Sequence, residues 1–144
     1  MRFHWVLAVG LSLLAVACGS STPTSPSTPA PLPVAPATIS ETYSSTLPVG
    51  ASKFYSFSVV ANGTVNLTLQ TLTGPSIGSD VTVELALGRP VGTGCSATTA
   101  VTVSTDTAAP HVTGTYLPGV YCVRVTDTGN LPAAASFAVL IEHS

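Results

Sequence analysis

Hydrophobic and polar residues alternate along the chain from about Thr38 onward, in short runs bounded by Gly, Pro, Asn and Asp. A period of two is typical of β-strands with one buried face, and helical periodicity is absent from this part of the sequence. The pattern predicts six or seven short strands and an all-β fold class, a single antiparallel β-sandwich over residues 38–144. The alternating runs lie at 55–59, 65–69, 81–87, 101–103, 120–126 and 137–141.

An Asn62-Gly63 pair separates the first two of these runs. Because Asn-Gly tolerates the positive φ angles of a type I′ turn, residues 53–71 are predicted to form a β-hairpin. The alternation directs most aromatic rings, Tyr55 among them, toward the core. Phe54 and Tyr116 are the rings expected to be exposed.

The N-terminus follows a different pattern, in which Arg2 precedes an uncharged run from Trp5 to Ala17. This run is shorter than the about 20 apolar residues of a transmembrane helix and has the length of an export signal. It ends in the sequence LAVACG at residues 14–19, which resembles the lipobox of bacterial lipoproteins, with Ala15 where that family usually has Leu.

The lipobox resemblance implies that residues 1–17 are a lipoprotein signal peptide and that Cys18 is lipidated and becomes the new N-terminus. A lipid anchor would then hold the protein on a membrane of the bacterial cell envelope. Gly19 follows the cysteine where a retention signal would have Asp, which implies sorting to the outer membrane. The alternative is a free or buried cysteine after an ordinary signal peptide.

Residues 18–37 are predicted to be a disordered linker between this anchor and the sandwich. Residues 20–36 contain six Pro, seven Ser or Thr and no charge. Proline blocks both helices and sheet ladders, so the segment is expected to extend over roughly 50 Å, at about 3.1 Å per residue.

Composition narrows the classes of partner. Charged residues make up 7% of the chain and the formal net charge is −2, so the basic surface that nucleic-acid binding requires is missing. Hydrophobic residues make up 45% and the mean hydropathy is +0.51, which disfavours disorder of the whole chain. Because about a quarter of the residues are Ser or Thr, the surface is expected to carry hydroxyls in place of charges.

With Cys18 assigned to lipid, Cys95 and Cys122 remain as a pair in an oxidising compartment, and we expect them to form a disulfide. Closing this loop would stabilise the fold by roughly 3.5 kcal/mol in the chain-entropy account. A metal site or thiol nucleophile is the alternative, but the sequence offers neither a CxxC spacing nor a nearby His pair.

Four stretches carry a second resemblance. They are residues 53–59 (KFYSFSV), 63–69 (GTVNLTL), 80–85 (DVTVEL) and 118–125 (PGVYCVRV). In their order and turns they resemble the bacterial pre-peptidase C-terminal (PPC) domain over nearly all of residues 40–142. The resemblance implies a jelly-roll-like β-sandwich that is appended to exported proteins. Some collagen-binding relatives hold calcium through acidic residues near the start of the domain, where this chain has only Glu41.

Several residues have side chains that occur as catalytic or metal-binding groups. Residues 74–78 match the G-x-S-x-G pattern around Ser76, but a strand is predicted to follow where a hydrolase needs a helix, so a loop is the favoured interpretation. His111 and His143 are expected to be exposed loop residues. Ser104 and Asp106 could form a Ser-His-Asp triad with one of these histidines, but nothing in the spacing of the residues requires it. A calcium site is possible but not favoured over ordinary turns at the three predicted strand ends that carry Asp80, Asp106 and Asp127.

The expected function is therefore a non-catalytic envelope lipoprotein whose sandwich binds or scaffolds another envelope protein or a polysaccharide, with no cofactor and no metal. A carbohydrate-binding module that uses Phe54 or Tyr116 is the alternative. A small secreted hydrolase that uses Ser76 is the remote one.

Overall fold

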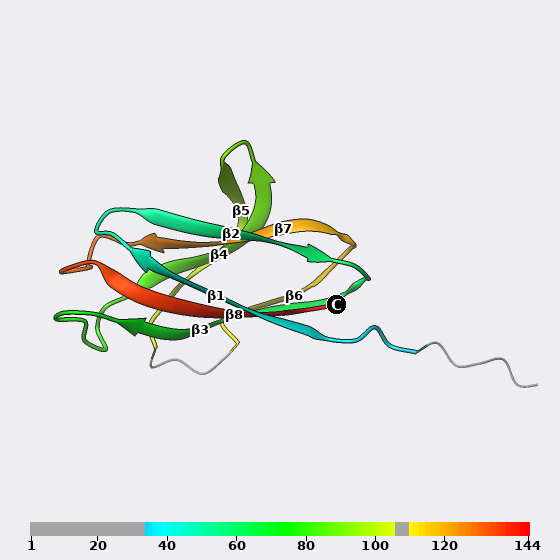
Figure 1. Ribbon diagram of the computed structural model, residues 1–144, viewed down its shortest axis with the longest axis horizontal. Coiled ribbons are helices and arrows are strands. Elements are labelled where there is room, and N and C mark those ends of the chain that lie inside the picture. The colour runs from blue at the N-terminus through cyan, green and yellow to red at the C-terminus, as the bar shows by residue number, and fades with distance from the viewer. Residues whose placement is uncertain (1–33, 106–109) are drawn as a thin grey trace, which may run out of the picture. The chain divides into compact units, whose positions relative to one another are not determined.

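Eight strands form two four-stranded antiparallel sheets in the computed structural model, which describes residues 34–105 and 110–144 (Figure 1). The predicted signal peptide, Cys18, most of the predicted linker and Asp106 lie outside these residues. The strands are β1 (Ile39–Leu47), β2 (Ser52–Val59), β3 (Gly63–Thr73), β4 (Val83–Val91), β5 (Gly94–Val103), β6 (Val112–Tyr116), β7 (Gly119–Asp127) and β8 (Ala135–His143).

The strand order is that of a jelly roll. The first sheet, sheet A, has the order β1-β8-β3-β6, and the second, sheet B, has the order β2-β7-β4-β5. Consecutive strands therefore lie in opposite sheets everywhere except at β4 and β5. Eight strands in two sheets with crossing connections are the mark of a double-sheet jelly roll, and the predicted all-β sandwich is confirmed.

The predicted hairpin over residues 53–71 is wrong. β2 pairs with β7, and β3 pairs with β8 and β6, so the two strands belong to different sheets. Neither Asn62 nor Gly63 has the positive φ that a type I′ turn needs. Alternation places Phe57 and Val65 in the same core from opposite sheets, and a sequence pattern cannot distinguish this arrangement from a shared sheet.

The structure has more strands than the alternation revealed. β1 and β6 were not predicted, and both are edge strands of sheet A. Each buries a single side chain, Leu47 in β1 and Val112 in β6, so neither carries a repeated apolar position. Hydroxyl-rich edge strands leave little trace in a hydrophobic pattern.

The core lies between the sheets and is lined by the inward-facing residues of both. Val83, Leu85 and Leu87 of β4 face Leu67 of β3 and Val139 of β8 across it, and all five are fully buried. Packing of the two inner faces in this way is the main source of sandwich stability. The outer faces of the two sheets, the edges and the two ends then remain as places for a functional site.

Candidate functional site

The outer face of sheet B carries an exposed aromatic ring. Alternation along β2 turns Phe57 and Val59 inward and Phe54 outward, where 40% of its surface is exposed. Exposed Ser52 and Ser56 flank it along the strand. The predicted exposure of Phe54 is confirmed, and its surroundings offer hydroxyls to a ligand.

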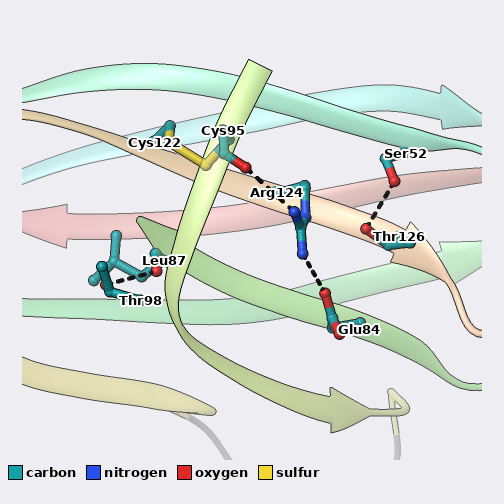
Figure 2. A network of polar contacts seen from close by, with 8 residues as sticks. All are labelled: Ser52, Glu84, Leu87, Cys95, Thr98, Cys122, Arg124 and Thr126. Atoms are coloured by element: carbon teal, nitrogen blue, oxygen red, sulfur yellow. Dashed lines mark hydrogen bonds and ion pairs between the residues drawn. A yellow bond between two sulfur atoms is a disulfide. The ribbon is translucent and has the colours of Figure 1, made fainter. Parts of the chain in front are cut away.

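Arg124 lies directly across from Phe54 in the β2–β7 register. Its guanidinium donates from Nη2 to Oε1 of Glu84 at 2.7 Å and from Nη1 to the carbonyl oxygen of Cys95 at 3.2 Å (Figure 2). Beside this pair, the hydroxyls of Ser52 and Thr126 are 2.9 Å apart. The guanidinium of Arg124 is thus held in place by two other residues of sheet B.

A disulfide joins Cys95 to Cys122, as predicted (Figure 2). Cys122 points outward from β7 yet is fully buried, because the β4–β5 hairpin bends over the outer face of sheet B (Figure 1). A register shift between Leu87 and Gly88 marks the bend. A Cβ at Gly88 would overlap the carbonyl oxygen of Ser96, so only glycine fits there. The disulfide therefore fastens the bent hairpin to the sheet.

Tyr116 differs from its prediction. It is half-buried and meets Tyr121 edge to face, with ring centroids 5.2 Å apart. The guanidinium of Arg89 stacks on the Tyr121 ring at 4.3 Å and donates to its hydroxyl, which in turn donates to the carbonyl oxygen of Leu117. Because Tyr116 stands in sheet A and Phe54 in sheet B, the two rings do not form one platform.

A polar cluster that the sequence did not reveal joins the edges of the two sheets. Glu41 of β1 accepts a 2.7 Å hydrogen bond from the Tyr55 hydroxyl of β2, and its other oxygen lies 2.9 Å from Nε2 of His143. Tyr55 stacks on Tyr43 with centroids 5.2 Å apart. Tyr55 points inward as predicted, but β2 is an edge strand, so the ring remains 38% exposed. No local signal could have found this cluster, since Glu41 and His143 are 102 residues apart.

These contacts shift the pKa values of both Glu41 and Tyr55. The hydrogen bond from Tyr55 and then that from His143 hold the pKa of Glu41 below its ordinary value. The same bond, which the ionised carboxylate strengthens, raises the pKa of Tyr55. Because an ionised carboxylate only accepts hydrogen bonds, Nε2 of His143 carries a proton.

Neither histidine is the exposed loop residue that was expected. His143 is buried at 2% exposure and packs on Phe57, with centroids 5.2 Å apart. His111 is half-buried and accepts the backbone N–H of Leu69 on Nδ1 at 3.0 Å. That contact lies just beyond the last pair of the β3–β6 register, Leu67 with Val112, where the side chain satisfies a backbone donor of β3.

Ser76 lies in a turn between β3 and β4, in agreement with the loop interpretation. The N–H of Ile77 donates to the carbonyl oxygen of Gly74, and Ser76 has φ of 60° at the turn's third position. Pro75 at the second position and the positive φ of Ser76 at the third fit a type II turn. The chain continues into β4, whereas a hydrolase would have a helix there.

The carboxylate of Asp127 is occupied by backbone donors. Gly50 donates to Oδ2 at 2.7 Å, and Gly129 and Leu131 donate to Oδ1. These bonds, led by that from Gly50, lower the pKa of Asp127. The expected turn chemistry at residues 127–130 is thus present. Within residues 34–105 and 110–144, no three His, Cys, Asp or Glu side chains group as metal ligands would.

In the part that the structure describes, no helix has the length and hydropathy to cross a membrane. No family model matches the chain, and no curated protein matches it.

Proposed function

We propose that the protein is a lipid-anchored component of a bacterial cell envelope, and that its PPC-like jelly roll binds another envelope component without catalysing a reaction. The lipobox-like sequence that ends at Cys18 supports the anchor. Gly19, which follows the cysteine where a retention signal would have Asp, supports the outer membrane as the location.

The observation that supports the non-catalytic role is that polar side chains of the sandwich make hydrogen bonds that stabilise its own strands and turns. The carboxylates of Asp127 and Glu41 accept hydrogen bonds that join strands and turns, and the Arg124 guanidinium bonds to Glu84 and Cys95. His111 supports the backbone of β3. A general acid or base must be within reach of a substrate proton, and groups committed to the scaffold are poorly placed for that.

The anchor is tested on the N-terminus of the chain produced in a bacterial host. We expect mass spectrometry to find a diacylated or triacylated Cys18 as the first residue, and Cys18→Ala to move the chain out of the membrane fraction. An unmodified residue other than Cys18 at the N-terminus would contradict the proposal. Ser20→Ala serves as the control, since it lies beside the site but outside the lipobox-like sequence.

The ligand is sought by capture from solubilised envelope, with proteins identified by mass spectrometry and glycans by sugar analysis. The affinity tag belongs in residues 20–33, because Ser144 at the C-terminus is buried and its carbonyl accepts the N–H of Val60. A saturable protein partner would support scaffolding. Recovery of neither class from envelopes would count against a binding role.

Polysaccharide binding is the second candidate, and the exposed Phe54 ring among serine hydroxyls favours it. Sugar rings stack on aromatic faces, and their hydroxyls bond to side chains such as Ser52 and Ser56. We expect Phe54→Ala to abolish glycan retention and Val49→Ala, another exposed apolar residue, to leave it unchanged. Equal retention by both variants would remove Phe54 from the site.

A further inference from the structure

Four exposed apolar side chains gather at one end of the sandwich, which we call the apolar end. Val60 is 67% exposed, Leu117 66%, Val120 51% and Ile39 40%. Scattered exposed apolar residues are ordinary, but a group of them at one place marks an interaction surface.

Strand pairing brings these four residues to the same end. Val59 pairs with Gly119 and Gly63 pairs with Tyr116, so the β2–β3 connection with Val60 runs beside the β6–β7 connection with Leu117. Val120 is paired with Ser58, one step into sheet B. Ile39 pairs with His143, and the next residue, Ser144, accepts the N–H of Val60. In Figure 1 this is the end at which the C-terminus is marked.

The chain enters the sandwich at this same end, because β1 begins at Ile39. Residues 18–38 therefore connect the apolar end, and not the opposite one, to the proposed lipidation site. The charges here are mixed, with Arg89 over the Tyr121 ring and Glu142 paired with Ser40. Neither sign dominates, so apolar contact must carry any docking at this surface.

We propose that the apolar end docks onto the lipid surface that holds the anchor, with Val60, Leu117 and Val120 entering the interfacial region. The inference rests on the proposed lipid anchor. The predicted linker of residues 18–37 keeps the anchored membrane within reach of this end, which raises its effective concentration there, so even a few apolar side chains suffice for contact. The outer face of sheet B, with Phe54, would then stand beside the membrane and remain open to a ligand.

The chain offers a clean optical test, because its single tryptophan is Trp5, within the segment that the proposal removes. Leu117→Trp places one tryptophan at the apolar end. Val49→Trp is the matched control, since Val49 is 57% exposed in the β1–β2 turn at the opposite end. Each lipidated full chain is reconstituted into phosphatidylethanolamine–phosphatidylglycerol vesicles, with and without brominated acyl chains.

Flotation with the vesicles is measured first, and chains that fail to float would contradict the anchor itself. Among chains that float, we expect Leu117→Trp emission to shift to shorter wavelength and to be quenched several-fold more than that of Val49→Trp. Adding Val60→Ser and Val120→Ser should reduce this quenching. Equal quenching at both ends would overturn the docking proposal while leaving the anchor intact. A blue shift that depends on protein concentration without vesicles would overturn it in favour of a second copy of the chain.

Discussion

The backbone N–H of Gly50 donates a 2.7 Å hydrogen bond to Oδ2 of Asp127, and this bond joins two turns that are 77 residues apart. Asp127 also donates its own N–H to the carbonyl oxygen of Ala51 at 3.0 Å. The β1–β2 turn, which crosses from sheet A to sheet B, is thereby fixed to the β7–β8 turn, which crosses back. One carboxylate thus holds together two crossings at the end of the sandwich opposite Ile39 and Ser144.

Asp127→Asn should lower the free energy of unfolding by about 1–3 kcal/mol at pH 7, because hydrogen bonds to a charged acceptor are replaced by weaker ones. Urea denaturation measures the difference. Asp80→Asn, at an exposed carboxylate, is the control and should change stability much less. An Asp127→Asn variant as stable as the wild type would show that the bonds to Gly50, Gly129 and Leu131 contribute little.

The same carboxylate predicts a pH dependence. Its pKa is lower in the folded state than in the unfolded chain, where it is near 3.9, so its contribution is complete above that value and is lost as the pH falls through the folded pKa. The stability difference between wild type and Asp127→Asn should therefore shrink as the pH is lowered from 5 to 2. A difference that stays constant over that range would contradict the assignment.

Tyr55→Phe should raise the pKa of Glu41 toward its ordinary value, since the hydroxyl of Tyr55 is the largest cause of its depression. Carbon-detected NMR titration of the Glu41 carboxyl carbon measures this. Tyr43→Phe keeps the stacked ring pair without touching the bond to Glu41, and it should leave the titration unchanged. A similar shift in both variants would assign the effect to ring packing.

Gly88→Ala should destabilise the fold by about 1–3 kcal/mol or more, because the added methyl group overlaps backbone that cannot move alone. Gly94→Ala on the same hairpin is the matched control, since its Cβ would find only ordinary contact, 3.7 Å from the carbonyl oxygen of Val91. Thermal unfolding of both variants compares them. Equal melting temperatures would mean that the hairpin moves to accommodate the methyl group.

Replacing both Cys95 and Cys122 with alanine should lower the free energy of unfolding by about 3.5 kcal/mol, the loop-closure value for a sequence separation of 27 residues. We also expect faster amide exchange in residues 88–97, because the hairpin loses its covalent attachment to β7. Exchange that rises uniformly over both sheets would instead indicate a general loss of stability.

Sequence alone was sufficient for features that depend on residues close to one another or on few alternatives. Alternation gave the fold class and the main core positions of β3, β4, β7 and β8. The assignment of Cys18 to lipid left one pair among the three cysteines. The partner of β2 could not be predicted, because Phe57 and Val59 are buried equally well by a hairpin or by a crossing to the other sheet. Likewise, the burial of His143 depends on Glu41 and Phe57, which no local pattern associates with it.

The order of sheet A sets a condition on how the protein can form. Its strand β8 lies between β1 and β3, so β1 has no neighbour to pair with, and β3 has only β6, until β8 has been delivered. Most contacts that hold the sandwich are consequently distant in sequence, a property that slows folding. For an exported chain, sheet A would stay open until β8 had been delivered, which suits translocation in an extended state.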